Sequence, residues 1–486
     1  MKGDLILKLY DLLEEPIKTE LSNIEISGVT SDNRKPLKGG ELFICIKGKT
    51  FDGHSVAEEM IKKGAAAVLV ERDLGLAQQI IVPDTRKEYA YICSRWFGCP
   101  EKKLKLIGVT GTNGKTTITT TLKNILSGFG KKTGLIGTCQ NEIGDEILHT
   151  ERTTPEAYEL FELFDLMVKK GCEYVVMEVS SQGLEQKRLG PCRFELGAFT
   201  NLTQDHLDVH GTMENYYEAK KLLFSMTDTA VINIDDDYGK RYAKEISCNT
   251  IKTFSTKKSA DFTASNENLL PSGVKYDFSD GKITLPVSFN MPGEFNVSNS
   301  LCAIACADVL GFDTAKTIDI LNSQKGVRGR AEVIPTGRDF TVICDYAHTP
   351  DAIENVLSAM RTSAKGRVVC LFGCGGNRDA KKRPLMAKAA EKYSDFLIIT
   401  SDNPRNEDPN LIIEDILAGI DKEKTNYITI TDRIEAINWA VQNAKKDDII
   451  VLCGKGHEDY QILPGGVKIH LDEREEVAKA LLKLKN

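Results

Sequence analysis

The sequence has no apolar run long enough to cross a lipid bilayer. Runs such as Ala65 to Val70 are far shorter than the roughly 20 residues that a membrane-spanning helix needs. Residues 1–10 contain lysines and an aspartate but no apolar core of signal-peptide length. We therefore expect a cytoplasmic protein without a membrane partner.

The sequence also lacks any CxxC pair and any excess of positive charge. Its 13 cysteines are scattered, often in apolar segments (Cys344, Cys370, Cys453), which favours buried free thiols over disulfides or a metal cluster. The formal net charge is −7, and a nucleic-acid partner would require a basic face. We therefore expect no nucleic-acid partner, although small anionic substrates need only local positive charge.

Internal repeats and low-complexity segments are absent as well. The chain has 486 residues, which is enough for two or three domains that each bury a core, and we expect a monomer. Short β-rich apolar runs are followed by glycine-rich or polar stretches, a pattern typical of α/β folds. Breaks near residues 98–103 and 327–330 predict domains at 1–102, 103–331 and 332–486.

Polar motifs follow the predicted strands of the third domain. These strands are expected at residues 341–344, 367–372, 396–400 and 448–452, and the motifs begin at Asp345, Gly373, Ser401 and Gly454. Ligands bind at the carboxyl ends of parallel strands in doubly wound sheets. The third domain is therefore predicted to be a Rossmann-like, doubly wound ligand-binding domain.

A phosphate-binding loop is the clearest motif of the second domain. A strand over residues 104–110 precedes Gly111-Thr112-Asn113-Gly114-Lys115-Thr116-Thr117, after which an apolar-periodic helix begins. Glycines allow backbone N–H groups to face phosphate oxygens, the lysine reaches the terminal phosphates, and Thr116 can bind Mg²⁺. Val109 replaces the first glycine of the general P-loop pattern. The motif predicts an ATP site in a central P-loop sheet.

A strand that ends in an acid is expected beside such a loop. Residues 174–179 form an apolar run that contains Glu178, whose carboxylate could hold a cation. The alternative is a glutamate at a strand end that faces solvent.

The chain resembles the UDP-N-acetylmuramoyl-tripeptide synthetases of the Mur ligase family over almost its whole length. Beyond Gly111 to Thr117 and Glu178, the resemblance rests on motifs in the family's order: residues 201–208, 217–220, 295–299, 328–330, 345–350 and 454–458. It implies an α/β fold of three domains: an N-terminal UDP-binding domain, a central ATPase, and a C-terminal amino-acid-binding domain. It also implies a role in peptidoglycan precursor synthesis.

The resemblance implies an ATP-dependent, Mg²⁺-dependent ligase mechanism. A carboxylate of UDP-N-acetylmuramoyl-L-alanyl-D-glutamate attacks the γ-phosphate of ATP to give an acyl phosphate, and the amine of the incoming amino acid then displaces phosphate. Both steps concentrate negative charge, so cations should carry much of the catalysis.

The resemblance also assigns residues to the ATP and metal sites. It implies that Glu178 and His206 bind Mg²⁺ and that Lys220 is carbamylated and binds a second Mg²⁺. Without the resemblance, Lys220 would be interpreted as a solvent-facing helical lysine and His206 as a structural histidine. It further implies that Asn299 contacts the adenine and that Arg330 and Asp345 bind the nucleotide, while His348 could bind there or merely end the strand.

Further residues resemble the family's contacts to the UDP-sugar-peptide. Two turns, at residues 29–34 and 51–54, resemble its UDP-binding turns, although ordinary turn chemistry explains them too. Arg188 suits an anionic peptide because a guanidinium can bind a carboxylate through two parallel hydrogen bonds. The predicted contacts are Ser31, Thr153, Thr154, Ser180, Gln186 and Arg188.

Asp402-Asn403-Pro404-Arg405 resembles the signature of members that add meso-diaminopimelate. Arg405 offers a forked donor for the carboxylate at the far end of that amino acid, a group that lysine lacks. By resemblance, Arg378 is a second arginine of this pocket, and Gly454 and Glu458 hold the distal amine. A structural ion pair at Arg405 is the alternative.

Three other functions remain open at this point. A lysine-adding ligase would use the same scaffold, whereas a folylpolyglutamate synthetase would share the phosphate loop but leave the N-terminal domain and Arg405 unexplained. An ATP-binding protein without ligase chemistry would need no amino-acid pocket.

Overall fold

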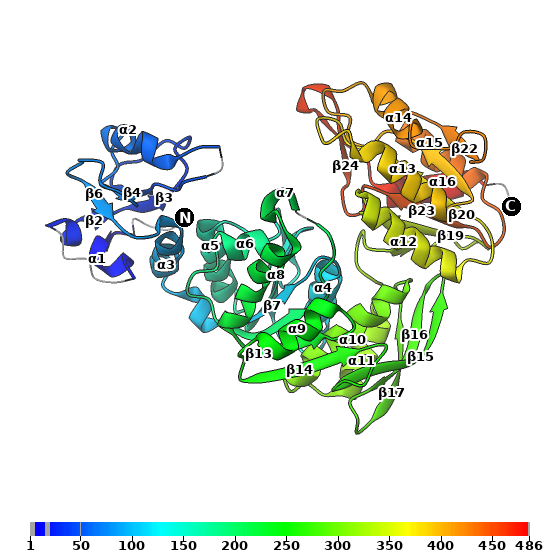
Figure 1. Ribbon diagram of the computed structural model, residues 1–486, viewed down its shortest axis with the longest axis horizontal. Coiled ribbons are helices and arrows are strands. Elements are labelled where there is room, and N and C mark those ends of the chain that lie inside the picture. Colours follow the sequence, from blue (N-terminus) through cyan, green and yellow to red (C-terminus); the bar gives the residue numbers. More distant parts are fainter. Residues whose placement is uncertain (1–4, 15–19, 49, 206, 485–486) are drawn as a thin grey trace. The chain divides into compact units, whose positions relative to one another are not determined.

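The computed structural model describes residues 5–14, 20–48, 50–205 and 207–484. The chain divides into two compact units, Met1–Phe254 and Ser255–Asn486, and each is described by itself (Figure 1). Among the described residues, no helix combines the length and apolarity needed to span a membrane. The thirteen cysteines are free thiols, and ten of them are buried, including Cys344, Cys370 and Cys453.

A small parallel sheet begins the first unit. Its strand order is β3-β4-β5-β6, with bounds Gly28–Thr30, Glu41–Ile44, Ala67–Val70 and Gln79–Ile81. β4 and β5 are buried along their whole length, and apart from Glu41 all their residues are apolar. The other elements are β1 (Leu7–Lys8), β2 (Glu25–Ile26), α1 (Leu9–Leu12), α2 (Ala57–Lys62), α3 (Thr85–Trp96) and the 3-10 turns η1 (Glu20–Asn23), η2 (Gly53–Val56) and η3 (Pro100–Lys103).

A larger sheet in the first unit has the order β10-β9-β8-β11-β7-β12-β13-β14. The strands from β8 to β14 in this order are parallel, whereas β9 and β10 are antiparallel additions. The strands are β7 (Lys105–Thr110), β8 (Thr133–Ile136), β9 (Asn141–Ile143), β10 (Glu146–Leu148), β11 (Tyr174–Glu178), β12 (Phe194–Phe199), β13 (Thr227–Asn233) and β14 (Thr250–Ser255). The helices are α4 (Lys115–Gly128), α5 (Ala157–Lys169), α6 (Ser181–Glu185), α7 (Leu207–His210), α8 (Met213–Lys221), η4 (Leu222–Met226) and α9 (Asp237–Glu245).

The position of β7 matters for function because it lies between β11 and β12. Successive strands are added on its two sides, so the chain diverges at the carboxyl end of β7, where ligands bind in open α/β sheets. Glu178 pairs in register with Val109, which places the end of β11 beside the predicted phosphate loop.

The second unit begins with the antiparallel strands β15 (Phe262–Leu270), β16 (Gly273–Ser279) and β17 (Thr284–Phe289). Two helices follow, α10 (Glu294–Val309) and α11 (Thr314–Ser323). α10 is buried over most of its surface, so its sequence is apolar on every side rather than on one stripe.

The rest of the second unit is a sheet of order β18-β19-β23-β20-β21-β22, parallel except for β18. Alternate strand residues face two separate cores: Phe372 packs with α12, α13 and α14, whereas Leu371 packs with α15 and α16 (Figure 1). This is the predicted doubly wound arrangement. The strands are β18 (Glu332–Ile334), β19 (Thr341–Asp345), β20 (Val368–Phe372), β21 (Phe396–Ile399), β22 (Tyr427–Thr429), β23 (Ile449–Cys453), β24 (Tyr460–Ile462) and β25 (Lys468–His470). The helices are α12 (Pro350–Ser363), α13 (Lys382–Tyr393), α14 (Pro409–Leu417), α15 (Arg433–Gln442), η5 (Pro464–Gly466) and α16 (Glu473–Lys483).

Candidate active site

The loop between β7 and α4 has the geometry of a phosphate-binding loop. Gly111 and Gly114 have φ of +147° and +87°, and a Cβ on Gly111 would lie 1.9 Å from Thr200 Oγ1. Lys115 Nζ donates to the carbonyl oxygens of Gly111 at 2.9 Å and Thr112 at 2.7 Å. The ammonium is therefore held against the loop, where phosphate oxygens could replace the carbonyls as its partners.

The carboxylate of Glu178 lies beside this loop and is buried, so the solvent-facing alternative is wrong. Its Oε1 accepts hydrogen bonds from Thr116 Oγ1 and from Thr138 N, each at 2.9 Å, and its Oε2 accepts one from Thr138 Oγ1 at 3.0 Å. Thr138 was not predicted from the sequence, although a polar residue shortly after the fully buried strand β8 was a usable signal. Hydroxyl and carboxylate oxygens are the donor set that Mg²⁺ prefers, so Thr116 and Glu178 fit this ion.

Lys220 is buried on α8, which contradicts the reading of a solvent-facing lysine. Its Nζ donates to the Gly111 carbonyl at 2.9 Å and lies 4.6 Å from the centre of the Tyr216 ring. Burial and the nearby Lys115 cation lower the pKa of Lys220 well below its usual value, and Asp205 opposes this only in part. The structure thus places Lys115 and Lys220 on the same loop carbonyl.

His206, predicted to bind Mg²⁺, lies outside the described residues. Among the residues that the structure does describe, no group of three His, Cys, Asp or Glu side chains is arranged to hold a metal ion.

The predicted sugar-peptide contacts other than Ser31 cluster around the end of β11. Thr154 Oγ1 donates to the Glu178 carbonyl at 2.9 Å and accepts from Ser180 N at 3.0 Å. Arg188 donates to Thr154 O and to Gln186 Oε1, each at 2.7 Å, and pairs with Glu156 at 2.8 Å.

Thr153 joins this cluster through Thr138, because their hydroxyl oxygens are 3.0 Å apart. Ser180 also caps α6, since its Oγ accepts from Gly183 N at 3.1 Å. Ser31 follows β3 in the small sheet and contacts the buried Tyr89 instead.

The predicted nucleotide-binding residues of the second unit lie in two places. Asp345 ends β19 and accepts hydrogen bonds from Ala331 N at 2.6 Å and Ala347 N at 2.8 Å. Burial raises the pKa of Asp345, and the attraction of Arg330 opposes that rise.

Asn299 lies on α10, where its amide donates to Asn296 Oδ1 at 2.9 Å. His348 Nδ1 is 2.8 Å from Tyr346 O, and burial lowers its pKa.

The predicted diaminopimelate residues meet at the carboxyl ends of β20, β21 and β23. Asn403 Nδ2 donates to Glu458 Oε2 at 3.0 Å, and a Cβ on Gly454 would lie 2.8 Å from Asp402 Oδ2. Arg405, next to Pro404, has φ +53° and donates from Nη1 to Gly376 O at 2.9 Å. Its Nη1 also donates to Asn403 O at 3.4 Å, so these two contacts are to backbone carbonyls and give no support to the structural ion-pair alternative. Arg378 is exposed on the neighbouring loop.

Two buried cations of this region were missed by the sequence analysis. Lys455 Nζ donates to Asn403 Oδ1 at 2.7 Å, Glu458 Oε2 at 3.0 Å and Tyr460 O at 2.6 Å. Arg433 forms a fully buried ion pair with Glu473 at 2.7 Å and donates to Cys453 O at the end of β23 at 2.8 Å. These contacts fix the loops that present Asn403 and Glu458.

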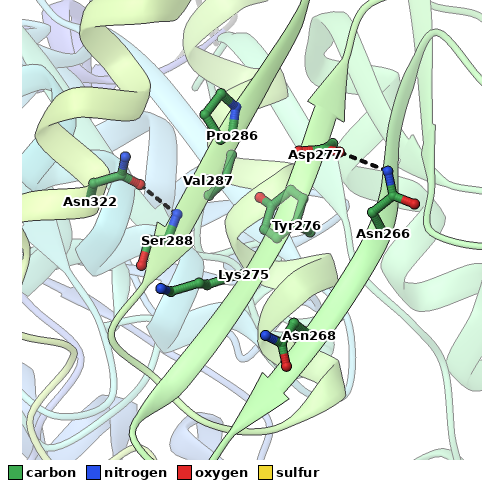
Figure 2. A pocket seen from close by; sticks show the side chains of 9 residues that line it. All are labelled: Asn266, Asn268, Lys275, Tyr276, Asp277, Pro286, Val287, Ser288 and Asn322. Carbon is green, nitrogen blue, oxygen red and sulfur yellow. Dashed lines mark hydrogen bonds between the residues drawn. The ribbon is translucent and has the colours of Figure 1, made fainter.

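A separate pocket of about 490 Å³ lies on the antiparallel strands β15, β16 and β17 (Figure 2). Lys275, Asp277 and Asn268 are among its lining residues, and Asn266 there donates to Asp277 at 2.8 Å. It contains none of the predicted site residues.

Three segments of the chain match known protein families. Residues 25–97 match the Mur ligase family catalytic domain, residues 109–307 the Mur ligase middle domain, and residues 329–456 the Mur ligase glutamate ligase domain.

Relatives match over the whole chain. A protein from Caldanaerobacter subterraneus subsp. tengcongensis, named UDP-N-acetylmuramoyl-L-alanyl-D-glutamate--2,6-diaminopimelate ligase, is 47% identical over 482 residues, which are 98% of this chain and 99% of its own. A protein of the same name from Clostridioides difficile is 45% identical over the full length of both chains. A solved structure of a ligase with this name is 34% identical, with a TM-score of 0.74 and coverage of 98% and 99%. A MurF ligase from Thermotoga maritima in complex with ADP, 18% identical over 94% of this chain and 97% of its own (TM-score 0.60), shares the fold.

The fold, the phosphate loop and these matches together define an ATP-dependent amide ligase. The chain belongs to the Mur ligase family. The predicted resemblance and the three-domain α/β fold class are thereby confirmed, whereas the exact domain bounds stay predictions.

Proposed function

We propose that this protein joins meso-2,6-diaminopimelate to UDP-N-acetylmuramoyl-L-alanyl-D-glutamate with consumption of ATP, a step of peptidoglycan precursor synthesis. The observation that carries the proposal is the cluster of Asn403, Arg405 and Glu458 at one end of the doubly wound sheet. It offers a guanidinium for a carboxylate and a carboxylate for an ammonium, the two groups at the distal end of diaminopimelate. The names of the full-length relatives support the same substrates.

The reaction begins with the substrate carboxylate as nucleophile. Its oxygen attacks the γ-phosphorus of ATP, the bond to the bridging oxygen breaks, and ADP leaves, so that an acyl phosphate forms. Lys115 would exchange the Gly111 and Thr112 carbonyls for phosphate oxygens and stabilise the charge that develops there. The amine of diaminopimelate then attacks the acyl carbon, inorganic phosphate departs from the tetrahedral intermediate, and the amine loses a proton.

Thr116, Glu178, His206 and carbamylated Lys220 are the residues that would hold Mg²⁺. Bound Mg²⁺ would neutralise the phosphate oxygens and orient the γ-phosphate for attack. The contact of Thr116 with Glu178 supports a shared cation at this point of the loop.

Carbamylation of Lys220 is supported by its environment. Only a neutral amine can attack carbon dioxide, and burial together with Lys115 favours the neutral form. The carbamate would place an anion next to the Lys115 ammonium, whereas a protonated Lys220 would repel that ammonium.

Peptide and nucleotide recognition are assigned to the remaining predicted residues. Thr154, Ser180, Gln186 and Arg188 form one hydrogen-bonded group with the backbone of Glu178, and Thr153 reaches the Glu178 side chain through Thr138. The peptide carboxylate would therefore be delivered next to the phosphate loop. The other assignments are Ser31 for the UDP end and Asn299, Arg330 and Asp345 for ATP.

The decisive experiment is phosphate release in a coupled assay with ATP, the UDP-dipeptide and either diaminopimelate or L-lysine. We expect release only when all three substrates are present, with a strong preference for diaminopimelate. Equal use of lysine would refute the amino-acid assignment. ATP hydrolysis at the same rate with and without the UDP-dipeptide and the amino acid would refute the ligase assignment.

A further inference from the structure

The two loops that carry Arg378 and Arg405 form one backbone-bonded structure. The first loop, residues 373–378, follows β20, and the second, residues 401–407, follows β21. Gly376 N donates to Asn403 O at 2.9 Å, and a Cβ on Gly376 would lie only 1.9 Å from Pro404 O. The loops therefore pack with no side chain between them, and their spacing sets the distance between the two arginines.

Glu407 connects these loops through both carboxylate oxygens. Its Oε1 accepts a hydrogen bond from the backbone N–H of Asn377, and its Oε2 accepts one from Arg383 Nη2 at 2.8 Å. Arg383 is buried and also pairs with Asp415 at 2.8 Å, so α13 and α14 anchor the carboxylate. The Asn377 N–H and the Arg383 guanidinium lower the pKa of Glu407, which keeps it ionised at neutral pH.

Asn377 needs such an anchor because of its backbone conformation. Its φ of +53° lies in the left-handed region, which asparagine adopts where local hydrogen bonds support it. A second contact, Asn406 N to Asn377 Oδ1 at 3.1 Å, supports the same conformation. Arg378 follows directly, so the direction in which its guanidinium leaves the loop depends on Asn377.

We propose that Glu407 is a positioning residue for amino-acid specificity: it holds Asn377 in the left-handed conformation and so directs Arg378 towards the carboxylate that Arg405 also binds. The inference rests on the proposed function, because it presupposes a substrate with a distal carboxylate. Glu407 itself touches no substrate. Displacement of a binding group by about 1 Å can cost on the order of 10²-fold in rate.

The test compares Glu407→Ala and Glu407→Gln with a matched control, Glu391→Ala. Glu391 also accepts a backbone N–H, that of Asp421 at 2.9 Å, and a hydroxyl, that of Thr425, but it lies on α13 and anchors a different loop. For Glu407→Ala we expect the KM for diaminopimelate to rise about 10- to 100-fold. The KM values for ATP and the UDP-dipeptide and the slow reaction with lysine should stay near wild type. Gln keeps the acceptor for Asn377 and should restore most of the affinity.

The outcomes distinguish a failure of the role proposed for Glu407 from a failure of the proposed function. The wild-type preference for diaminopimelate is measured first, and its absence would refute the proposed function. If that preference is present and Glu407→Ala keeps it, or if the variant slows both amino acids alike as a general loss of folding would, the role of Glu407 is refuted. A matching rise in KM for Glu391→Ala would also overturn it.

Discussion

Removal of the Arg405 guanidinium should cost most of the activity with diaminopimelate and little of the activity with lysine. Nη1 donates to Gly376 O at 2.9 Å, and the other N–H groups of the fork are the donors assigned to the distal carboxylate. Two hydrogen bonds between charged groups contribute about 1.5–3 kcal/mol each, or about 3–6 kcal/mol together. At about 1.4 kcal/mol per tenfold change, Arg405→Ala should lower kcat/KM for diaminopimelate by about 10²- to 10⁴-fold.

Lysine has no distal carboxylate, so its slow reaction should change little. The ratio of kcat/KM for diaminopimelate to kcat/KM for lysine should therefore fall by nearly the same factor as kcat/KM for diaminopimelate. Wild-type discrimination is expected to be on the order of 10⁴-fold, as in other sites built around one polar group. Arg405→Lys should recover only part of the rate, because an ammonium cannot form two parallel hydrogen bonds with one carboxylate.

The assay is phosphate release at saturating ATP and UDP-dipeptide, with each amino acid varied. Arg361→Ala, which removes an arginine of α12 that pairs with Asp395, controls for the loss of a surface guanidinium in the same domain. Loss of the bond to Gly376 O should lower stability by only about 1 kcal/mol, so thermal unfolding should show a folded variant. If Arg405→Ala slows both amino acids alike, or leaves diaminopimelate unaffected, the assignment is refuted.

Three further predictions concern the phosphate loop and its buried lysine. Lys115→Ala should lower kcat by at least about 10²- to 10³-fold without unfolding the protein, whereas Lys131→Ala on the surface should not; near-normal turnover of Lys115→Ala would remove the ATP assignment. Lys220→Ala should be nearly inactive and partly rescued by acetate, and full activity without rescue would contradict the carbamate. The pKa of Lys220 in the folded protein is well below 10.5, the ordinary value that the lysine has in the unfolded chain. Between these two pKa values the unfolded chain binds more protons than the folded protein. Burial of Lys220 therefore destabilises the folded protein more at neutral pH than at pH 10. In buffer free of carbon dioxide, chemical unfolding should show a larger free energy of unfolding for Lys220→Met than for wild type at pH 7, and this difference should decrease towards pH 10. A difference that does not depend on pH would refute the neutral buried amine.

Local sequence determined the parts of the site that depend on neighbours along the chain. Gly114-Lys115-Thr116 after an apolar strand requires a tight loop and a helix start, and the structure has α4 beginning at Lys115. Glu178 was likewise predictable as an acid at the end of a buried strand. Strand β12 runs from Phe194 to Phe199 and ends where polar residues begin in the sequence. The polar residues after it turn towards the phosphate loop, where Thr200 Oγ1 donates to Asn113 O at 2.6 Å.

Tertiary structure alone decided the state of the buried cations. Lys220 meets Gly111 across 109 residues of sequence, and nothing in its own helix distinguishes it from an exposed lysine. The same holds for Lys455, which meets Asn403 across 52 residues, and for Arg433, which pairs with Glu473 across 40. Such pairings depend on the order in which strands join a sheet, and the local periodicity of a sequence contains no information about that order. A buried charge is stable only where a distant segment supplies its partners, so the fold, rather than the residue type, decided which lysines and arginines serve the site.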